Sequence, residues 1–581
     1  MDASDATWKQ NSVSNDWNTA ENWRPQTIPN STGAIATFGG SNTTTVLCQK
    51  SSDGVYAHTY VGDVVFAPGA SAYTIRITPA SDVLYPSLIE FHQHGIVNNS
   101  GIVQNLVAAN SGTTKASGAI YFAGAASAGD NVVITNEGGA SASGDGYYGG
   151  LTEISAYNGD TASAGNATFI NNGGTVDGSS GGFTFLLQAS SAEAATFISN
   201  PGAVSGANAG YTWVALYSPG NIHNSAFIAN AATVSGAEGG WAEIDGGTCE
   251  GASFTANGAT IAGAQGGQIY VYGADGYATF NGKGGSGSDA QGGLIDLFNL
   301  PNSAQTIVIA EAGRNGGLGG TIMAEEDAVL DQGQFRLRGN GALDLTNGTT
   351  QSVSIGSLAG NGMVSLAGHT LSIGNNNLST TFSGLIQEDG SITKVGTGTL
   401  TVTGANNYTG ATTVTAGTLR INNQTGSGTG TGNVKLNAGI LGGQGIIGGL
   451  VTIGTGNGAG AVLAPSAGSN RLAVLTIQRA LTFKADGTYT YRLNTRNPSA
   501  DQVIAKGLTI ESRAQFVFQS LGSRRLQIGE VFIAISNTSP NPIVGTFANL
   551  PDNSTFISDH NNFQVSYSGG DGNDLTLTVV P

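Results

Sequence analysis

Short segments in which apolar and polar residues alternate recur along most of the chain. Residues 183–187 (FTFLL) and 268–272 (QIYVY) are examples, and both are bounded by Gly, Asn, Ser or Asp. Alternation over four to seven residues rich in β-branched and aromatic types is typical of half-buried strands between turns. Helical periodicity is nearly absent, and only residues 324–330 favour a helical turn. The pattern therefore predicts an all-β protein.

Two sequence markers repeat in step through the middle of the chain. The first is the Phe of a short Ala-rich phrase, at Phe169, Phe197, Phe227, Phe254 and Phe280. The second is a small or Gly pair, which ends at Gly182, Gly210, Gly240, Gly267 and Gly293 and advances by the same intervals as the Phe. Such a period with two or three strands per unit predicts coils of a right-handed parallel β-helix, or β-solenoid. The repeated Phe would then stack on its copies inside the solenoid.

The C-terminal half carries a different repeat. Residues 394–402 (KVGTGTLTV) and 406–410 (NNYTG) lead into a Thr- and Gly-rich strand pattern that ends near residue 421. This run resembles the passenger-associated repeat of bacterial autotransporters, and the likeness continues at 436–443 (LNAGILGG) and 463–466 (LAPS). The resemblance implies a β-helical passenger domain displayed on the bacterial surface, with a C-terminal region that assists folding.

The two ends of the chain bear on how it is exported. Met1–Asp5 lacks the basic, apolar and small-residue sections of a signal peptide, and no membrane barrel follows Pro581. We expect either an excised passenger, whose signal peptide and anchor are absent from this chain, or a relative exported and anchored by other means. Both alternatives place the protein outside the cell or on its outer surface.

A β-helix must hide both open ends, because unpaired strand edges invite further strands. We therefore predict four segments. They are an N-terminal cap with the first strands at 1–70, a β-helix at 71–345, autotransporter-like repeats at 346–480 and a C-terminal cap at 481–581. Each coil of the β-helix is expected to span about 26 to about 30 residues, as in other solenoids. An antiparallel pair is expected at 489–493, within the C-terminal cap.

Charge excludes several classes of partner. The chain has 21 Lys and Arg against 38 Asp and Glu, and no basic residue lies between Lys115 and Lys283, where twelve acids occur. Such a surface repels nucleic acid and anionic lipid, so neither is an expected partner. No apolar stretch is long enough for a transmembrane helix. Cys48 and Cys249 are the only cysteines, and their separation leaves open whether they pair.

Carboxylates and Trp residues of the central coils are the candidate site. Glu243 and Asp245 lie two positions apart and share one face of a strand, with Trp213 and Trp241 as platforms on which sugars can stack. Glu153 and Asp296 occupy places comparable to Glu243 and suggest a carboxylate row. Paired carboxylates can hydrolyse a glycosidic bond, but a strand that buries one face leaves polar residues on the other regardless. We predict a binding surface at Trp213, Trp241, Glu243 and Asp245, and no catalytic residue.

No cofactor or structural metal is predicted. His92 and His94 provide too few ligands for a transition metal. Residues 569–577 (GGDGNDLTL) fit a calcium-binding nonapeptide, but a lone copy offers only half of the cage. Whether Ca²⁺ binds at residues 569–577 therefore stays open, as does the binding of cations along residues 116–282.

These observations favour a non-enzymatic rod that acts in adhesion, spacing or self-association. A long repeated face would make many weak contacts with cell-surface glycans or with other copies of the chain, and their number would supply the affinity. One alternative is a polysaccharide-processing enzyme that uses carboxylates of the central coils. Another is an architectural subunit that polymerises end to end.

Overall fold

The chain forms two compact units in a computed structural model, residues 1–323 and residues 324–581. The structure describes residues 5–49, 57–79, 86–110, 116–142, 149–156, 160–217, 220–298, 305–325, 329–347, 351–458 and 460–581. Among these residues the one helix is a 3₁₀ turn, η1 (Ala20–Asn22). No helix in the described part of the chain is long and apolar enough to cross a membrane. The all-β prediction is confirmed.

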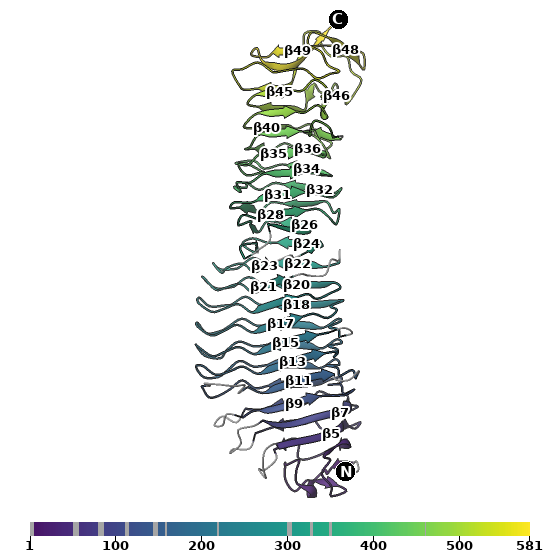
Figure 1. The fold of residues 1–581 in the computed structure, drawn as a ribbon, viewed down its shortest axis with the longest axis vertical. Helices are drawn as coiled ribbons and strands as arrows, with labels where there is room; N and C mark the ends of the chain where they lie inside the picture. Colours follow the sequence, from purple (N-terminus) through teal and green to yellow (C-terminus); the bar gives the residue numbers. More distant parts are fainter. Residues whose placement is uncertain are drawn as a thin grey trace. The chain divides into compact units, whose positions relative to one another are not determined.

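Strands of the first unit alternate along the chain between two sheets, and strands of successive coils lie above one another (Figure 1). The first sheet has the order β2 (Trp23–Arg24), β1 (Ala6–Trp8), β3 (Ser31–Phe38), β5 (Ala57–Phe66), β7 (Ser87–Asn98), β9 (Gly118–Phe122), β11 (Leu151–Ala156), β13 (Phe183–Gln188), β15 (Tyr211–Leu216), β17 (Trp241–Asp245), β19 (Gln268–Tyr272) and β21 (Leu294–Phe298). The second sheet contains β4 (Thr45–Cys48), β6 (Thr74–Ile77), β8 (Gln104–Ala108), β10 (Val132–Asn136), β12 (Thr168–Asn171), β14 (Thr196–Ser199), β16 (Ala226–Ala229), β18 (Ala252–Ala256), β20 (Ala278–Gly282) and β22 (Ile307–Ala310). From β3 onward the pairs between coils are parallel, which confirms the predicted β-solenoid.

The repeated Phe forms the expected ladder inside this unit. Phe197 and Phe227 are paired in register on β14 and β16, and their ring centroids are 4.9 Å apart with planes within 10°. The other neighbouring rings, from Phe169 to Phe280, stack at 4.8–5.1 Å. In-register parallel strands lie about 4.8 Å apart, so a Phe repeated at coil spacing stacks on its copy. Each ring is therefore buried by the coils on both sides.

The second Gly of each pair lies where two backbones meet. A Cβ on Gly210 would lie 2.0 Å from the carbonyl oxygen of Asn171, and one on Gly240 would lie 1.9 Å from that of Ser199. Any side chain at these positions would force the strand end of the preceding coil to move. This close approach is the physical reason why Gly recurs in step with Phe.

Three Trp residues cover the first coil. Trp8, Trp17 and Trp23 are buried, and their rings lie 5.6–6.0 Å from the ring of Phe38. β1 and β2 pair in antiparallel fashion, unlike the coils that follow. The four predicted segments and their boundaries stay predictions.

The second unit has shorter coils. Its strands are β24 (Val329–Leu337), β25 (Ala342–Asp344), β26 (Ser352–Gly360), β27 (Met363–Ser365), β28 (Thr370–Ile373), β29 (Thr380–Phe382), β30 (Leu385–Gln387), β31 (Ser391–Lys394), β32 (Thr399–Val402), β33 (Thr412–Val414), β34 (Thr418–Ile421), β35 (Val434–Leu436), β36 (Gly439–Gly443), β37 (Ile446–Ile447), β38 (Val451–Ile453), β39 (Ala461–Leu463), β40 (Val474–Ile477), β41 (Leu481–Phe483), β42 (Gly487–Asn494), β43 (Ser499–Ala500), β44 (Gln502–Ala505), β45 (Leu508–Ile510), β46 (Gln515–Ser520), β47 (Val531–Asn537), β48 (Thr555–Ser558), β49 (Asn561–Gly569) and β50 (Asp574–Val580). Ile373, Lys394, Val414 and Leu436 are register partners in successive coils, and their positions show how short each coil is.

Two local expectations differ from the structure. The helical turn predicted at 324–330 is wrong, because β23 (Thr321–Glu325) and β24 are extended there, and residues 326–328 lie outside the described part of the chain. Residues 489–493 belong to β42, which pairs in parallel with β39 and β46. Only Leu493 and Asn494 pair in antiparallel fashion, with β43. The main antiparallel pairs of this unit join β47, β50, β49 and β48.

Lys394 occupies an inward position of β31 and is 1% exposed. Its register partners, Ile373 and Val414, are apolar. Its Nζ donates hydrogen bonds to carbonyl oxygens of the adjacent turn, including that of Gly396 at 3.0 Å. Burial lowers the pKa of Lys394 from its ordinary 10.5 to about 8. Backbone carbonyl oxygens, and not a carboxylate, therefore stabilise the ammonium charge of Lys394.

Replacement of Gly210 by Ala tests the close approach between coils. We expect Gly210→Ala to reduce the free energy of unfolding by about 1–3 kcal/mol, the usual cost of overpacking, because the new Cβ meets the Asn171 carbonyl. Gly40→Ala is the matched control, since no atom lies within 4 Å of its Cβ. Urea unfolding followed by Trp and Tyr fluorescence measures both. Equal midpoints for the two variants would contradict the argument.

The pKa of Lys394 predicts how stability changes with pH. Below about pH 8 the folded and the unfolded chain are both protonated at Lys394, and folding bears the full cost of burying the charge. Above pH 8 the folded chain loses this proton first, so the unfolded chain binds more protons and stability rises with pH. Between pH 7.5 and 9.5 we expect the urea midpoint of the wild type to rise relative to that of Lys394→Met. Lys435→Met, which removes an exposed Lys of β35, should follow the wild type, and parallel curves for all three proteins would refute the prediction.

Candidate functional site

The first sheet presents a large outward surface between β11 and β21. Ile154, Leu186, Val214, Ile244 and Val271 point into the core, so the alternate residues of these strands point outward. We call the outward residues the aromatic face: Leu151, Glu153, Phe183, Phe185, Leu187, Tyr211, Trp213, Ala215, Trp241, Glu243, Asp245, Gln268, Tyr270, Tyr272, Leu294, Asp296 and Phe298. Aromatic rings and carboxylates dominate it.

Strand register aligns the middle of this surface into one row. We call it the central row, and in order it contains Tyr60, Glu90, Tyr121, Glu153, Phe185, Trp213, Glu243, Tyr270 and Asp296, on β5 to β21. Consecutive members lie on neighbouring strands, about 4.8 Å apart. Glu153, Glu243 and Asp296 are aligned in the expected row, but aromatic residues separate its members and Asp296 is buried.

All four residues predicted for binding lie on the aromatic face. Trp213 is the register partner of Glu243, and Trp241 and Asp245 flank Glu243 on the same side of β17. Trp241 is 39% exposed, and its ring centroid lies 5.3 Å from that of Tyr270. The structure therefore brings these residues together, and their role in binding stays a prediction.

Hydrogen bonds and ring contacts hold this surface in place. The Tyr211 hydroxyl donates to Glu243 Oε2 at 2.6 Å. The rings of Phe185 and Trp213 meet edge to face, with centroids 5.7 Å apart. Side chains held in this way lose little freedom when a ligand binds, which favours recognition. The sequence reasoning missed Tyr211 and Tyr270, although both lie on predicted strands.

Two carboxylates of the central row differ in environment. Glu90 accepts hydrogen bonds from His58 Nε2 at 2.7 Å and lies 2.9 Å from His92 Nε2. The hydrogen bond from His58 is the main cause that lowers the pKa of Glu90. Burial, and then the charge of Glu90, raise the pKa of Glu153, which lies two strands away. The sequence reasoning missed this cluster, because His58 and Glu90 belong to strands of different coils, β5 and β7.

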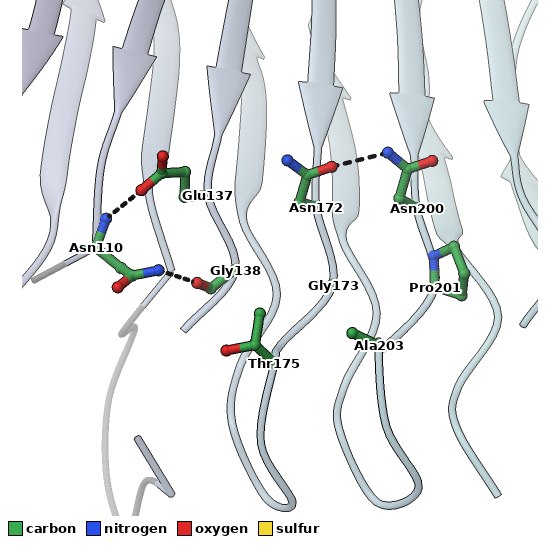
Figure 2. Close-up of a pocket in the computed structure, with 9 residues that line it drawn as sticks. All are labelled: Asn110, Glu137, Gly138, Asn172, Gly173, Thr175, Asn200, Pro201 and Ala203. Carbon is green, nitrogen blue, oxygen red and sulfur yellow. Dashed lines mark hydrogen bonds between the residues drawn. The ribbon is translucent and has the colours of Figure 1, made fainter. Parts of the chain in front are cut away.

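A pocket of about 360 Å³ lies at the edge of the second sheet, beside the turns that leave β10, β12 and β14 (Figure 2). It is lined by polar groups such as Asn110, Glu137 and Thr175. Asn200 Nδ2 donates to Asn172 Oδ1 at 2.9 Å across the pocket wall, and Arg76 pairs with Glu137 at 2.9 Å. Its polar groups thus satisfy one another and provide no nucleophile or acid–base pair.

The same hydrogen bond recurs along the solenoid. Asn230 donates to Asn200 at 2.8 Å and Asn257 donates to Asn230 at 2.7 Å, so four Asn side chains form a ladder. Each of these Asn residues follows a Phe of the ladder by the same number of positions, so the two markers advance together. The sequence contained this signal, and the sequence reasoning did not use it.

The remaining candidates are not joined into a metal site. His92 and His94 contact different carboxylates, Glu90 and Asp63, and no group of three His, Cys, Asp or Glu side chains among the described residues is suited to a metal ion. Asp574, within residues 569–577, accepts a hydrogen bond from the backbone N–H of Asn537 at 2.8 Å, near the turn between β49 and β50. Its carboxylate is therefore engaged in the fold.

Cys48 and Cys249 are both buried and free. Burial raises the pKa of Cys48 to about 11, and that of Cys249 to about 12. Thiols with such high pKa values are weak nucleophiles at neutral pH. The two residues therefore neither pair nor form a reactive site.

Comparison with known proteins finds one family model. Residues 392–421, which include β32, β33 and β34, match the passenger-associated-transport-repeat. No curated protein matches the chain. The crystal structure of the Haemophilus influenzae Hap adhesin is similar over 96% of this chain and 65% of its own, less than two thirds of that protein, at 10% identity and a TM-score of 0.29. The repeat match agrees with the resemblance seen in the sequence: this chain is a β-solenoid that carries a passenger-associated transport repeat.

Proposed function

We propose that the chain is a secreted or surface-displayed passenger that acts as an adhesive rod. The passenger-associated repeat at 392–421 supports the route to the cell surface. The aromatic face supports adhesion, with cell-surface glycans as the ligand and other copies of the chain as a second class of partner.

One observation carries the proposal. Each of the five successive strands from β13 to β21 presents at least one aromatic ring outward, including Phe183, Tyr211, Trp241, Tyr272 and Phe298. A contiguous apolar surface of this kind on a stable protein is commonly a binding site. Sugar rings offer an apolar face that stacks on aromatic rings, and their hydroxyl groups can donate hydrogen bonds to Glu243 and Gln268.

The geometry also explains how weak contacts add up. Successive strands repeat the same kind of contact at intervals of about 4.8 Å, so a chain-like ligand can engage several strands at once. Each further contact is made within a complex already formed, which raises the overall affinity without any strong single site. A rod with such a face is suited to adhesion or spacing.

Polysaccharide cleavage by Glu243 and Asp245 stays an alternative. Glu243 is bonded to the Tyr211 hydroxyl, and Asp245 is exposed at the end of β17. A binding role uses both residues as hydrogen-bond acceptors and needs no difference in protonation between them. Within the described part of the chain, no contact of these two residues favours cleavage over binding.

A panel of neutral, acidic and amine-bearing polysaccharides tests the proposal, with bound protein and new reducing ends followed in the same wells. We expect binding without release of reducing ends. Trp213→Ala and Trp241→Ala should each weaken the binding about fivefold or more, on the order of 1 kcal/mol, because each removes a stacking surface. Ile557→Ala removes an apolar residue that is 77% exposed in the second unit, and it should leave binding unchanged.

Two results would contradict the proposed adhesive function of the aromatic face. Binding that is unaffected by both Trp variants would place the adhesive surface elsewhere. Reducing ends that are released by the wild type and lost in Glu243→Gln would make the chain a carbohydrate-active enzyme.

A further inference from the structure

Aromatic residues separate the carboxylates of the central row from one another. Glu153 pairs in register with Phe185, Phe185 with Trp213, Trp213 with Glu243, and Glu243 with Tyr270. Since Tyr121 pairs with Glu153 on the preceding strand, Glu153 and Glu243 each have an aromatic neighbour on both sides. An acidic patch that served only solubility would not need these rings.

The strands that carry Glu153 and Glu243, and the strands between them, contain no Lys or Arg. The sequence contains no Lys or Arg between Lys115 and Lys283, which spans β9 to β20. Burial, followed by the charge of Glu90, raises the pKa of Glu153. A cation supplied by a ligand would stabilise the ionised form of Glu153, whereas an anionic ligand would be repelled.

Rings beside carboxylates are the groups that recognise organic ammonium ions. A cation over an aromatic face within about 6 Å gains roughly 0.5–2 kcal/mol, and a charged hydrogen bond to a carboxylate adds to it. Trp213, Tyr211 and Trp241 surround Glu243 on the aromatic face, and the Trp241 ring lies 5.6 Å from that of Tyr211. An amino sugar satisfies both kinds of group, since its ring stacks and its ammonium meets the carboxylate.

We propose that the central row selects glycan chains that carry free amino groups, such as a deacetylated hexosamine polymer, over neutral or acidic glycans. This inference rests on the proposed function, because it names the ligand of the aromatic face. The chain of sugars would lie along the solenoid axis, across the strands. One sugar residue of an extended glycan is about as long as the strand spacing of roughly 4.8 Å, so successive sugars would meet successive strands.

The test compares two ligands that differ only in acetylation. Glucosamine oligomers with free amines and fully N-acetylated oligomers of equal length are titrated into the full chain at pH 6, at low and at moderate salt. We expect the free-amine oligomer to bind at least tenfold more tightly, with a preference that shrinks as salt increases. Glu153→Gln and Glu243→Gln should each reduce the preference to about threefold or less, because each weakens binding of the free-amine oligomer more than binding of the acetylated one.

Three further measurements separate the outcomes. Asp177→Asn removes an exposed carboxylate outside the aromatic face and should keep the full preference, which excludes an effect of net charge alone. Trp213→Leu should weaken both oligomers, because stacking serves both. Circular dichroism and the thermal midpoint check that every variant, including Trp213→Leu, is folded.

The proposal fails in distinct ways. Equal affinity for the two oligomers would overturn the selection for amines and leave glycan adhesion intact. Absence of binding to every glycan would refute the proposed function as well. Poly-lysine that binds as tightly as the free-amine oligomer would show a general cation surface and overturn the assignment to glycans.

Discussion

Register between successive coils is the constraint on which the rest of the structure depends. In the first unit, β14 pairs with β16 so that Phe197 lies beside Phe227, and β15 pairs with β17 so that Trp213 lies beside Glu243. A slip of one residue would turn the Phe ladder toward solvent and the polar face toward the core. Since no coil can bury its own Phe, each coil is stable only between its neighbours. The close contact at Gly210 is part of the same register.

The same pairing satisfies polar groups inside and outside the solenoid. Asn171 is buried, accepts from Asn136 at 2.7 Å and donates to Thr212 at 2.9 Å. On the outside, each side chain of the Asn ladder likewise bonds to the equivalent Asn one coil away. Buried polar groups need hydrogen bonds, and a repeated Asn finds one in its own copy. Lys394 has no such copy and uses turn carbonyls instead.

On the outer surface, register determines the chemistry of each carboxylate. Glu90 lies among His58 and His92, and its pKa falls; Glu153, two strands away, is partly buried and its pKa rises. Glu243 is held by a phenol from the preceding coil. Neighbours contributed by other coils, and not the local sequence, give each of these residues its properties. A surface assembled in this way can vary from coil to coil while the core repeats.

The sequence by itself determined the all-β class, the solenoid and its period, because two markers advanced by equal intervals and alternation identifies strands locally. It also placed Trp241, Glu243 and Asp245 on one face, since residues two apart on a strand share a side. Only the tertiary structure decided that the Tyr211 hydroxyl donates to Glu243, that His58 meets Glu90, and that Lys394 points inward. The Gly and Phe markers align the central coils with one another, but they do not extend to β5, β7 or β31, so spacing does not specify which residues become neighbours there. Hydrogen bonds between strands one coil apart make that choice, and a local sequence pattern does not show them.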